Sequence, residues 1–200
     1  MSALRFRLRT AGPGDAEAVA LLHADSWRRF YRGAYADSYL DGDVVSDRLA
    51  VWSARLAAQC GTETILAEAE SEAEGDTESA GGTALLGFVH TAFDDDDRWG
   101  SLIDNLHVRS DLRRTGVGRA LMIRAAGSVA ERTATGAMYL WVLEQNTAAQ
   151  RFYQALGGAR VEKAHLDPPG GDRSKINGDP LKFRMAWPDA SLLARGGGAG

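Results

Sequence analysis

The stretch that most constrains the fold of this chain is residues 101–122, where an apolar strand pattern runs into a turn with two glycines and then into a helix pattern. Gly116 and Gly118 have no Cβ, so the backbone there can approach an anion closely and point consecutive N–H groups at it. The helix that begins at this turn adds its own unpaired N–H groups and the positive end of its dipole. The stretch therefore predicts a binding site for a diphosphate group.

Two well-known nucleotide-binding turns are excluded at this position. A dinucleotide-binding turn needs a third small residue where this chain has Leu121, and a P-loop needs a Gly-Lys-Ser/Thr sequence that is absent. The chain has instead Arg-x-x-Gly-x-Gly over residues 113–118, after a strand that ends in Leu106-His107-Val108. This arrangement resembles the pyrophosphate-binding loop of the GCN5-related N-acetyltransferases, the GNAT family.

A second motif follows the helix expected at 117–132. Residues 137–146 form a strand pattern that ends in Asn146, and residues 147–158 form a helix pattern with Phe152 and Tyr153 that ends in glycine. The pair resembles the second GNAT motif and stands in the same order along the chain. The resemblance covers residues 4–187, although only these two central motifs are specific.

The expected fold is α/β (α+β), a single GNAT-like domain over residues 1–188 followed by a disordered tail over 189–200. The resemblance implies a central, mixed and mostly antiparallel twisted sheet with two splayed parallel strands, flanked by about four helices. The hydrophobic periodicity supports this order of elements. Strands are expected at 4–9, 62–70, 84–93, 101–108, 137–143, 159–166 and 181–187, and helices at 15–31, around 45–56, at 117–132 and at 147–156.

The resemblance implies acetyl-CoA as cosubstrate. The backbone along Leu106, His107 and Val108 would bond the pantetheine arm, the turn would hold the diphosphate, and one side of the helix after Asn146 would face the arm. The side chain of His107 alternates away from its neighbours and is expected to pack on the opposite face. The remaining residues expected to bind the cofactor are Arg113, Arg114, Thr115, Gly116, Val117, Gly118, Arg119, Ala149 and Tyr153.

Acyl transfer from a thioester to an amine needs a neutral amine and a proton for the departing thiolate. By resemblance Tyr153 supplies that proton or a hydrogen bond to the sulfur; the alternative is a tyrosine that only packs against the arm. Asp104 is the best local candidate for a base, since it shares a strand face with Leu106 provided that no bulge intervenes. The alternative for Asp104 is a structural hydrogen-bond acceptor, and many relatives carry a glutamate earlier, where this chain has Ser101 and Leu102.

The segment after the first expected strand is rich in aromatic residues at four-residue spacing. Trp27, Tyr31 and Tyr35 would line an acceptor pocket opposite the long connection 167–180, or they would pack in the core. The run Asp94–Asp97 lacks the spacing and glycine of a calcium loop, so no metal site is expected.

Composition narrows the remaining classes. A chain of 200 residues with 44% hydrophobic residues suits one domain, and without a leader or a long apolar run we expect a cytoplasmic protein that does not enter a membrane. The single Cys60 excludes an internal disulfide and is expected to be buried. The net charge is −4, no basic stripe with aromatic residues is present, and nucleic-acid binding is not expected.

The sequence thus predicts an enzyme that transfers the acetyl group of acetyl-CoA to a primary amine of a small molecule or peptide, directly within a ternary complex. The alternative is a non-catalytic acyl-CoA sensor that kept the diphosphate site. The pattern does not identify the amine acceptor. A homodimer through the two C-terminal strands is compatible with the sequence but does not follow from it.

Overall fold

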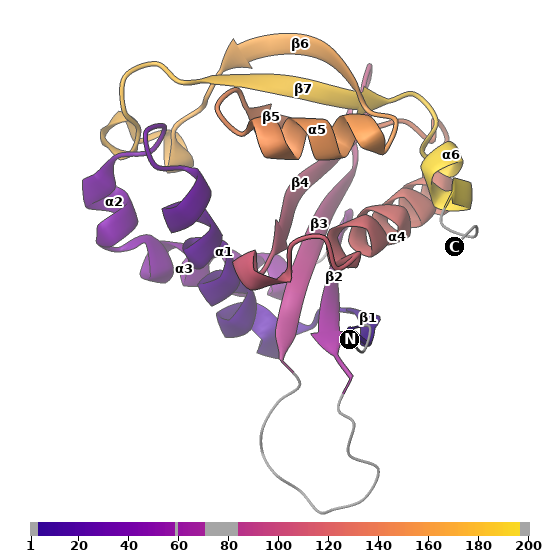
Figure 1. The fold of residues 1–200 in the computed structure, drawn as a ribbon, viewed down its shortest axis with the longest axis horizontal. Helices are drawn as coiled ribbons and strands as arrows, with labels where there is room; N and C mark the ends of the chain where they lie inside the picture. Colours follow the sequence, from indigo (N-terminus) through magenta and orange to yellow (C-terminus); the bar gives the residue numbers. More distant parts are fainter. Residues whose placement is uncertain (1–3, 59, 71–83, 197–200) are drawn as a thin grey trace, which may run out of the picture.

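A seven-stranded sheet forms the centre of the protein in the computed structural model, which describes residues 4–58, 60–70 and 84–196 (Figure 1). The strands are β1 (Phe6–Thr10), β2 (Thr62–Ala69), β3 (Leu85–Asp96), β4 (Gly100–Val108), β5 (Met138–Leu143), β6 (Ala159–His165) and β7 (Leu181–Trp187). The helices are α1 (Ala16–Phe30), α2 (Asp37–Asp41), α3 (Val44–Ala58), α4 (Val117–Arg132), α5 (Thr147–Ala155) and α6 (Ala190–Arg195).

The strand order across the sheet is β1-β2-β3-β4-β5-β7-β6, and only the pair β4–β5 is parallel. These two strands pair at Ser101 with Met138 and at Leu102 with Tyr139, and then they diverge. The expected mixed, mostly antiparallel sheet with splayed parallel strands is therefore confirmed. The divergence leaves the edge of β4 that faces β5 without a strand partner over its C-terminal half.

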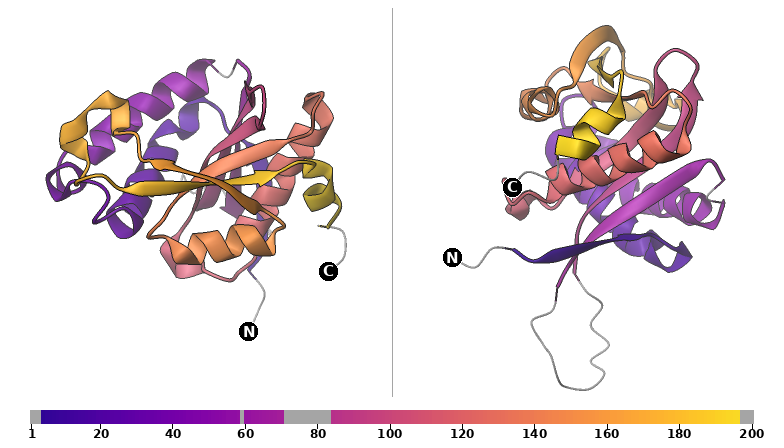
Figure 2. Two further views of the ribbon diagram at one scale, coloured as in Figure 1. Left: turned by 90° about the horizontal axis from the view of Figure 1, so that it is seen from above. Right: turned by 90° about the vertical axis from the view of Figure 1, so that its right-hand side faces the viewer.

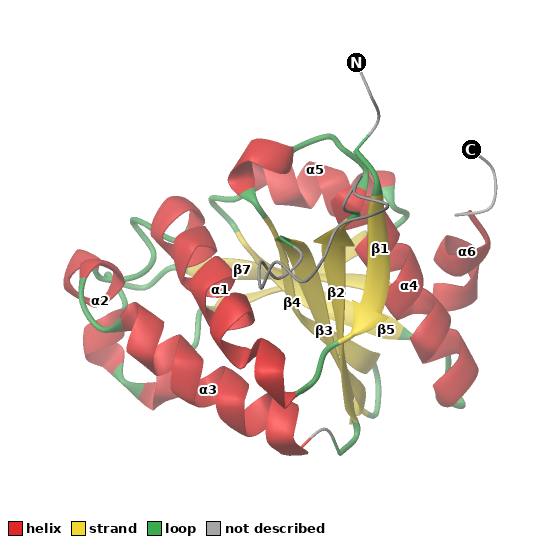
Figure 3. Ribbon diagram, turned by 90° about the horizontal axis from the view of Figure 1, so that it is seen from below, coloured by secondary structure: helices red, strands yellow, loops and turns green. Residues whose placement is uncertain are grey.

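Helices cover both faces of the sheet, as Figure 3 shows from below. On one face α1 and α3 bury Val19, Trp52 and Leu56 against Leu66 and Phe88 of β2 and β3. On the other face α4 and the end of α5 pack on residues of β2, β3 and β4. This second core includes Ile65, Val89, Ile103, Leu121, Met122, Ala125, Val129 and Leu156. Successive strand residues alternate between the two cores because the side-chain period of a strand is two.

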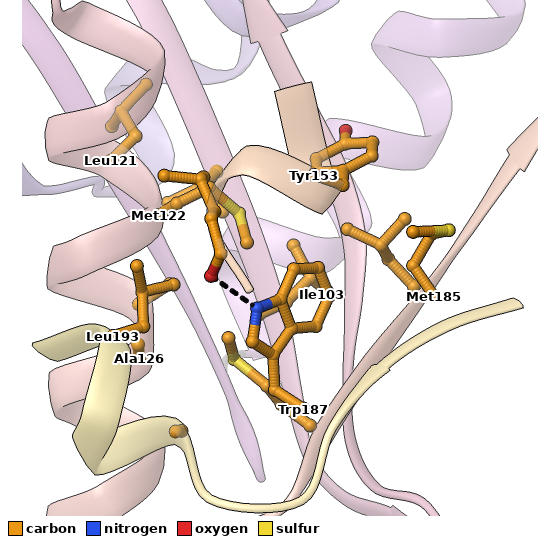
Figure 4. Close-up of a cluster of buried hydrophobic side chains, with 14 of the residues drawn as sticks. Ile103, Leu121, Met122, Ala126, Tyr153, Met185, Trp187 and Leu193 are labelled. Atoms are coloured by element: carbon orange, nitrogen blue, oxygen red, sulfur yellow. Dashed lines mark hydrogen bonds between the residues drawn. The ribbon is translucent and has the colours of Figure 1, made fainter. Parts of the chain in front are cut away.

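Helix α5 ends where the sequence indicated. Gly157 has φ of +86°, a conformation that favours glycine. A Cβ at Gly158 would lie 2.5 Å from the Trp187 ring, so the next position also requires glycine. The Trp187 indole Nε1 donates a hydrogen bond to the Leu156 carbonyl at 2.9 Å, and this bond is the dashed line in Figure 4. The end of α5 is thereby fixed to β7.

The C-terminal segment differs from expectation. Instead of a disordered tail beginning at 189, residues 190–195 form α6, which lies beside α4 (Figure 2). The Asp189 side chain caps this helix by accepting from the Ser191 N–H at 2.9 Å. Ala190 and Leu193 are buried in the core. Periodicity did not indicate α6, because residues 189–195 carry only one cap and a short apolar pattern before the glycine-rich end. Residues 197–200 lie outside the described part of the chain.

Two smaller differences concern connections. The 32–42 connection contains the short helix α2, and Cys60 is exposed rather than buried because it lies in the turn between α3 and β2.

Two longer connections complete the chain. The turn expected between the strands at 62–70 and 84–93 lies outside the described residues. The long connection 167–180 packs against the segment that follows α1, where the Ala36 N–H donates to the Lys175 carbonyl and the Asn177 N–H to the Ala34 carbonyl.

Two absences concern the described residues alone. Within 4–58, 60–70 and 84–196, no helix is both long and apolar enough to cross a membrane. Within the same ranges, no group of three or more His, Cys, Asp or Glu side chains is placed to hold a metal ion.

Candidate functional site

A groove of about 720 Å³ lies where β4, α4, α5 and the end of α1 meet. It brings together all but one of the residues that the sequence analysis expected to bind the cofactor. The exception is Val117, whose side chain is fully buried in the core, so that only its backbone is available at the groove. The predicted residues that line the groove are Leu106, His107, Val108, Arg113, Arg114, Thr115, Gly116, Gly118, Arg119, Asn146, Ala149 and Tyr153.

One end of the groove is the turn that leads into α4. Gly116 caps this helix with φ of +90°, a left-handed conformation that glycine adopts without strain. The Ala120 N–H bonds back to the Gly116 carbonyl, which places the N–H groups of residues 117–119 in the first turn, where a helix has no internal partner for them. Arg114 also has a positive φ of 64°, so the loop curls tightly before the helix. These features form a concave surface of N–H donors suited to an anion.

The floor of the groove is the free edge of β4. Because β4 and β5 pair at only two positions, the backbone of residues 106–108 is not paired with β5 and faces the gap between the two strands. On its other edge β4 remains paired with β3, through Leu106 with Val89 and Val108 with Gly87. A rigid strand thus offers one row of hydrogen-bonding groups to an extended ligand.

Helix α5 forms the opposite wall. Asn146 begins it by accepting the Ala149 N–H at 3.1 Å, which fixes the start of the helix at the end of β5. Tyr153 lies two turns further on, lines the groove and is only 8% exposed. Burial raises the pKa of the Tyr153 phenol, and the nearby Tyr31 phenol raises it further. Tyr153 therefore keeps its proton throughout the physiological pH range.

The placement of Asp104 corrects the sequence analysis. The pairing of β3 with β4 passes from His90–Asn105 to Thr91–Ile103, so Asp104 is the extra residue of a β-bulge. Asp104 therefore does not share the face of Leu106; its carboxylate accepts from Arg55 of α3 at 2.5 Å and from the Asn105 side chain at 2.7 Å. The bulge turns this side chain toward the α3 side of the sheet.

The aromatic residues of the α1 segment divide into two groups. Trp27 and Tyr35 are only 6% and 5% exposed and pack with Tyr39 and Ile176 in a small core of their own, so they do not line the groove. Tyr31 lies at the end of α1 and does line it. Burial together with the charge of Asp104 raises the pKa of Tyr31 to about 12. Of the three expected acceptor contacts, Tyr31 alone faces the groove.

The structure adds groove residues that the sequence analysis did not select. Phe152 is partly buried and lies over the start of α4, where a Cβ at Gly118 would be 3.5 Å from its ring. Helical spacing could have indicated this, because Phe152 follows the predicted groove residue Ala149 by three positions. No sequence signal marked the α1 members, since that helix is distant along the chain. The added residues are Ser26, Phe30, Arg109, Leu112, Ala148, Arg151 and Phe152.

One curated relative is similar to this chain in sequence, and solved structures share its fold. An uncharacterized N-acetyltransferase of Bacillus subtilis, YuaI, is 26% identical over 187 residues, covering 93% of this chain and 95% of the relative. The PaiA N-acetyltransferase of Thermoplasma acidophilum, solved in complex with coenzyme A, superposes with a TM-score of 0.63 at 16% identity, covering 92% of this chain and 98% of that one. Arabidopsis thaliana NAA60, solved with acetyl-CoA, gives 0.62 at 17% identity over 92% and 98%.

These likenesses extend over nearly the whole chain. The model of the acetyltransferase (GNAT) family matches residues 25–158, from the second half of α1 to just past the end of α5, and hence covers the turn before α4, the free edge of β4 and Tyr153. The protein therefore belongs to the GNAT family and is an acetyltransferase.

Proposed function

We propose that this protein is an acetyl-CoA-dependent N-acetyltransferase that moves the acetyl group directly to a primary amine of a small molecule or peptide within a ternary complex. One observation carries the proposal: a single groove joins an anion-binding turn, an unpaired strand edge and a buried, protonated tyrosine. A thioester on a phosphorylated carrier needs these three features in this order: an anion site for the phosphates, a strand edge for the arm, and a proton donor near the sulfur.

Each part of acetyl-CoA would have a matching part of the groove. The N–H groups at the start of α4 would hold the diphosphate, and the open space at Gly116 and the small Gly118 leave room for it. The pantetheine arm would follow the free edge of β4 at Leu106 and Val108 like an added strand. Asn146 and Ala149 line the facing side. The acetyl group would then reach the interior end of the groove, close to Tyr153.

Tyr153 is proposed as the acid. The amine nitrogen attacks the thioester carbonyl carbon, a C–N bond forms, the C–S bond breaks, and the sulfur leaves as a thiolate that needs a proton. A phenol that burial keeps protonated can donate this proton or a hydrogen bond to the sulfur. The position of Tyr153 on the short, anchored helix α5 would hold it in place.

Asp104 remains the proposed base, now from the bulge. The carboxylate would take a proton from the acceptor ammonium on the side of the sheet that carries α1 and α3, while Arg55 and Asn105 hold the carboxylate in position. Tyr31 would contact the acceptor directly. Trp27 and Tyr35 would support Tyr31 from behind, since their ring centroids lie 5.6 and 5.0 Å from the Tyr31 ring.

Two further parts of the proposal concern the setting of the enzyme. A cytoplasmic location would give it access to acetyl-CoA.

A homodimer would form through β6 and β7, because β6 is an edge strand and its residues 159–163 are exposed. Light scattering of the purified protein tests the homodimer, and a monomeric mass at micromolar concentration would contradict it.

The proposed activity is tested by titrating the protein calorimetrically with acetyl-CoA and then assaying thiol release over a panel of primary amines. Binding with amine-dependent thiol release supports the enzyme. Binding without release on any amine of a broad panel favours the acyl-CoA sensor instead. No binding of acetyl-CoA contradicts the assignment of the groove.

A further inference from the structure

Coenzyme A carries two separate anionic groups, the diphosphate and the phosphate on the 3′ position of the ribose. The turn before α4 offers one set of N–H donors, over residues 117–119. This set is suited to the diphosphate, so a second and independent cationic group is needed for the 3′-phosphate. Arginine is the side chain best matched to such a group, since its planar guanidinium can bond two phosphate oxygens at once.

Five arginines line the groove, and three of them are already engaged. Arg109 pairs with Asp111 at 2.7 Å, the guanidinium of Arg113 lies over the Phe30 ring at 4.9 Å, and Arg119 donates to the Gly196 carbonyl at 2.9 Å. Among the described residues, neither Arg114 nor Arg151 has a hydrogen bond or ion pair. These two are the guanidinium groups free to bind a ligand.

Arg114 and Arg151 differ in where they stand. Arg114 belongs to the curled turn itself, in a left-handed conformation that places it with the diphosphate donors. Arg151 stands on α5, the helix that lines the groove beside the start of α4, and it is exposed. Along α5, Ala149 and Tyr153 share the side toward the free edge of β4, while Arg151 lies about half a helical turn away, beside Ala148. Arg151 is therefore at the outer rim, where the ribose would emerge.

We infer that Arg151 binds the 3′-phosphate of coenzyme A and so selects the phosphorylated cofactor over its dephospho form. The inference rests on the proposed function, because it takes the groove to be the acetyl-CoA site. It assigns to α5 a second role besides carrying Tyr153. One side of the helix would face the thioester, and Arg151 on another side would hold the 3′-phosphate. Arg151 would thus act in cofactor binding and not in the chemical step.

The test compares the affinities of coenzyme A and 3′-dephospho-coenzyme A by calorimetry in the unaltered protein and in Arg151→Gln. The unaltered protein is expected to favour coenzyme A by about tenfold or more, as charge-assisted hydrogen bonds typically give. In Arg151→Gln this preference is expected to fall to about twofold or less, while the affinity for the dephospho form stays unchanged. In assays the variant is expected to raise KM for acetyl-CoA and leave kcat unchanged, the pattern of a binding contact.

Two matched variants complete the design. Arg5→Gln removes the same charge at an exposed position outside the groove and should keep the full preference. If Arg151→Gln keeps that preference, or if Arg114→Gln alone removes it, the assignment to Arg151 is overturned. Failure of the unaltered protein to bind either ligand would overturn the proposed function itself, and the two failures are therefore distinguishable.

Discussion

The imidazole rings of His23 and His107 lie with their centroids 4.5 Å apart and inclined by only 32°. His107 thus packs against α1, on the face of β4 where the sequence placed its side chain. Burial, the largest cause, lowers the pKa of His107 to about 4; Arg48 lowers it further and Asp104 opposes the shift. Burial also depresses the pKa of His23, whose Nε2 has no partner among the described residues.

This pair predicts a loss of stability in mild acid. Below about pH 6.5 a histidine in the unfolded chain becomes protonated, whereas His107 in the folded protein stays neutral down to about pH 4. The free energy of unfolding therefore falls as the pH drops through this window. His107 alone would contribute at most about 3 kcal/mol. Urea unfolding of His107→Phe from pH 7 to 4 should show a shallower decline than the unaltered protein. His165→Gln, at an exposed site, should leave the decline unchanged; equal slopes for all three proteins would contradict this prediction.

Tyr153→Phe is expected to lower kcat by about 100-fold, because the thiolate loses its proton donor, with little change in acetyl-CoA affinity. The raised pKa of Tyr153 further predicts no loss of kcat from this group as the pH rises to 9. Tyr139→Phe is the matched control, since the Tyr139 hydroxyl bonds Asp95 away from the groove. An unchanged kcat in Tyr153→Phe would remove it as the acid.

Gly118→Leu is expected to abolish binding of coenzyme A while the protein stays folded. A Cβ there meets Phe152 and Val108 at 3.5 and 3.6 Å, ordinary contact distances, so the longer side chain would fill the groove rather than break the helix. Calorimetry measures the binding and circular dichroism the fold. Gly127→Leu in the same helix, where nothing lies within 4 Å of the new Cβ, should bind normally. Retained affinity of Gly118→Leu for coenzyme A would contradict the proposed placement of the diphosphate.

Asp104→Asn is expected to lower kcat/KM for the amine by about 100-fold at neutral pH, because the amide cannot accept the proton of the ammonium. The loss should shrink as the pH approaches the pKa of the free amine, where the acceptor arrives already neutral. A pH profile of kcat/KM measures both effects. Asp25→Asn breaks an exposed ion pair with Arg29 and serves as control. A reduction that is the same at every pH would indicate a structural role for Asp104.

Leu193→Ala is expected to destabilise the protein by about 2 to 4 kcal/mol, since it removes a buried side chain from the contact between α6 and α4. Leu192→Ala, at a neighbouring position that is 65% exposed, should change the free energy of unfolding by less than about 0.5 kcal/mol. Denaturant unfolding measures both. Similar small effects would mean that α6 does not dock stably in solution.

The features of this protein that depend on local physics can be predicted from its residues. The glycine turn before α4 follows from Gly116 and Gly118 beside a helix start, and α5 follows from the Asn146 cap and the glycines after it. Such features need only backbone sterics and near neighbours, and the structure contains them where the residues indicated.

Which side chains contact one another depends instead on how the elements pack in three dimensions. The bulge that turns Asp104 toward Arg55 depends on how β4 pairs with β3, and a one-residue change of register reverses the side on which a residue lies. The burial of Trp27 depends on Ile176 of the 167–180 connection packing into the same small core, and Tyr31 lines the groove because the end of α1 lies beside it. Arg151 reaches the groove only because α5 packs beside the start of α4. These contacts join segments far apart in the chain, where periodicity carries no information about partners.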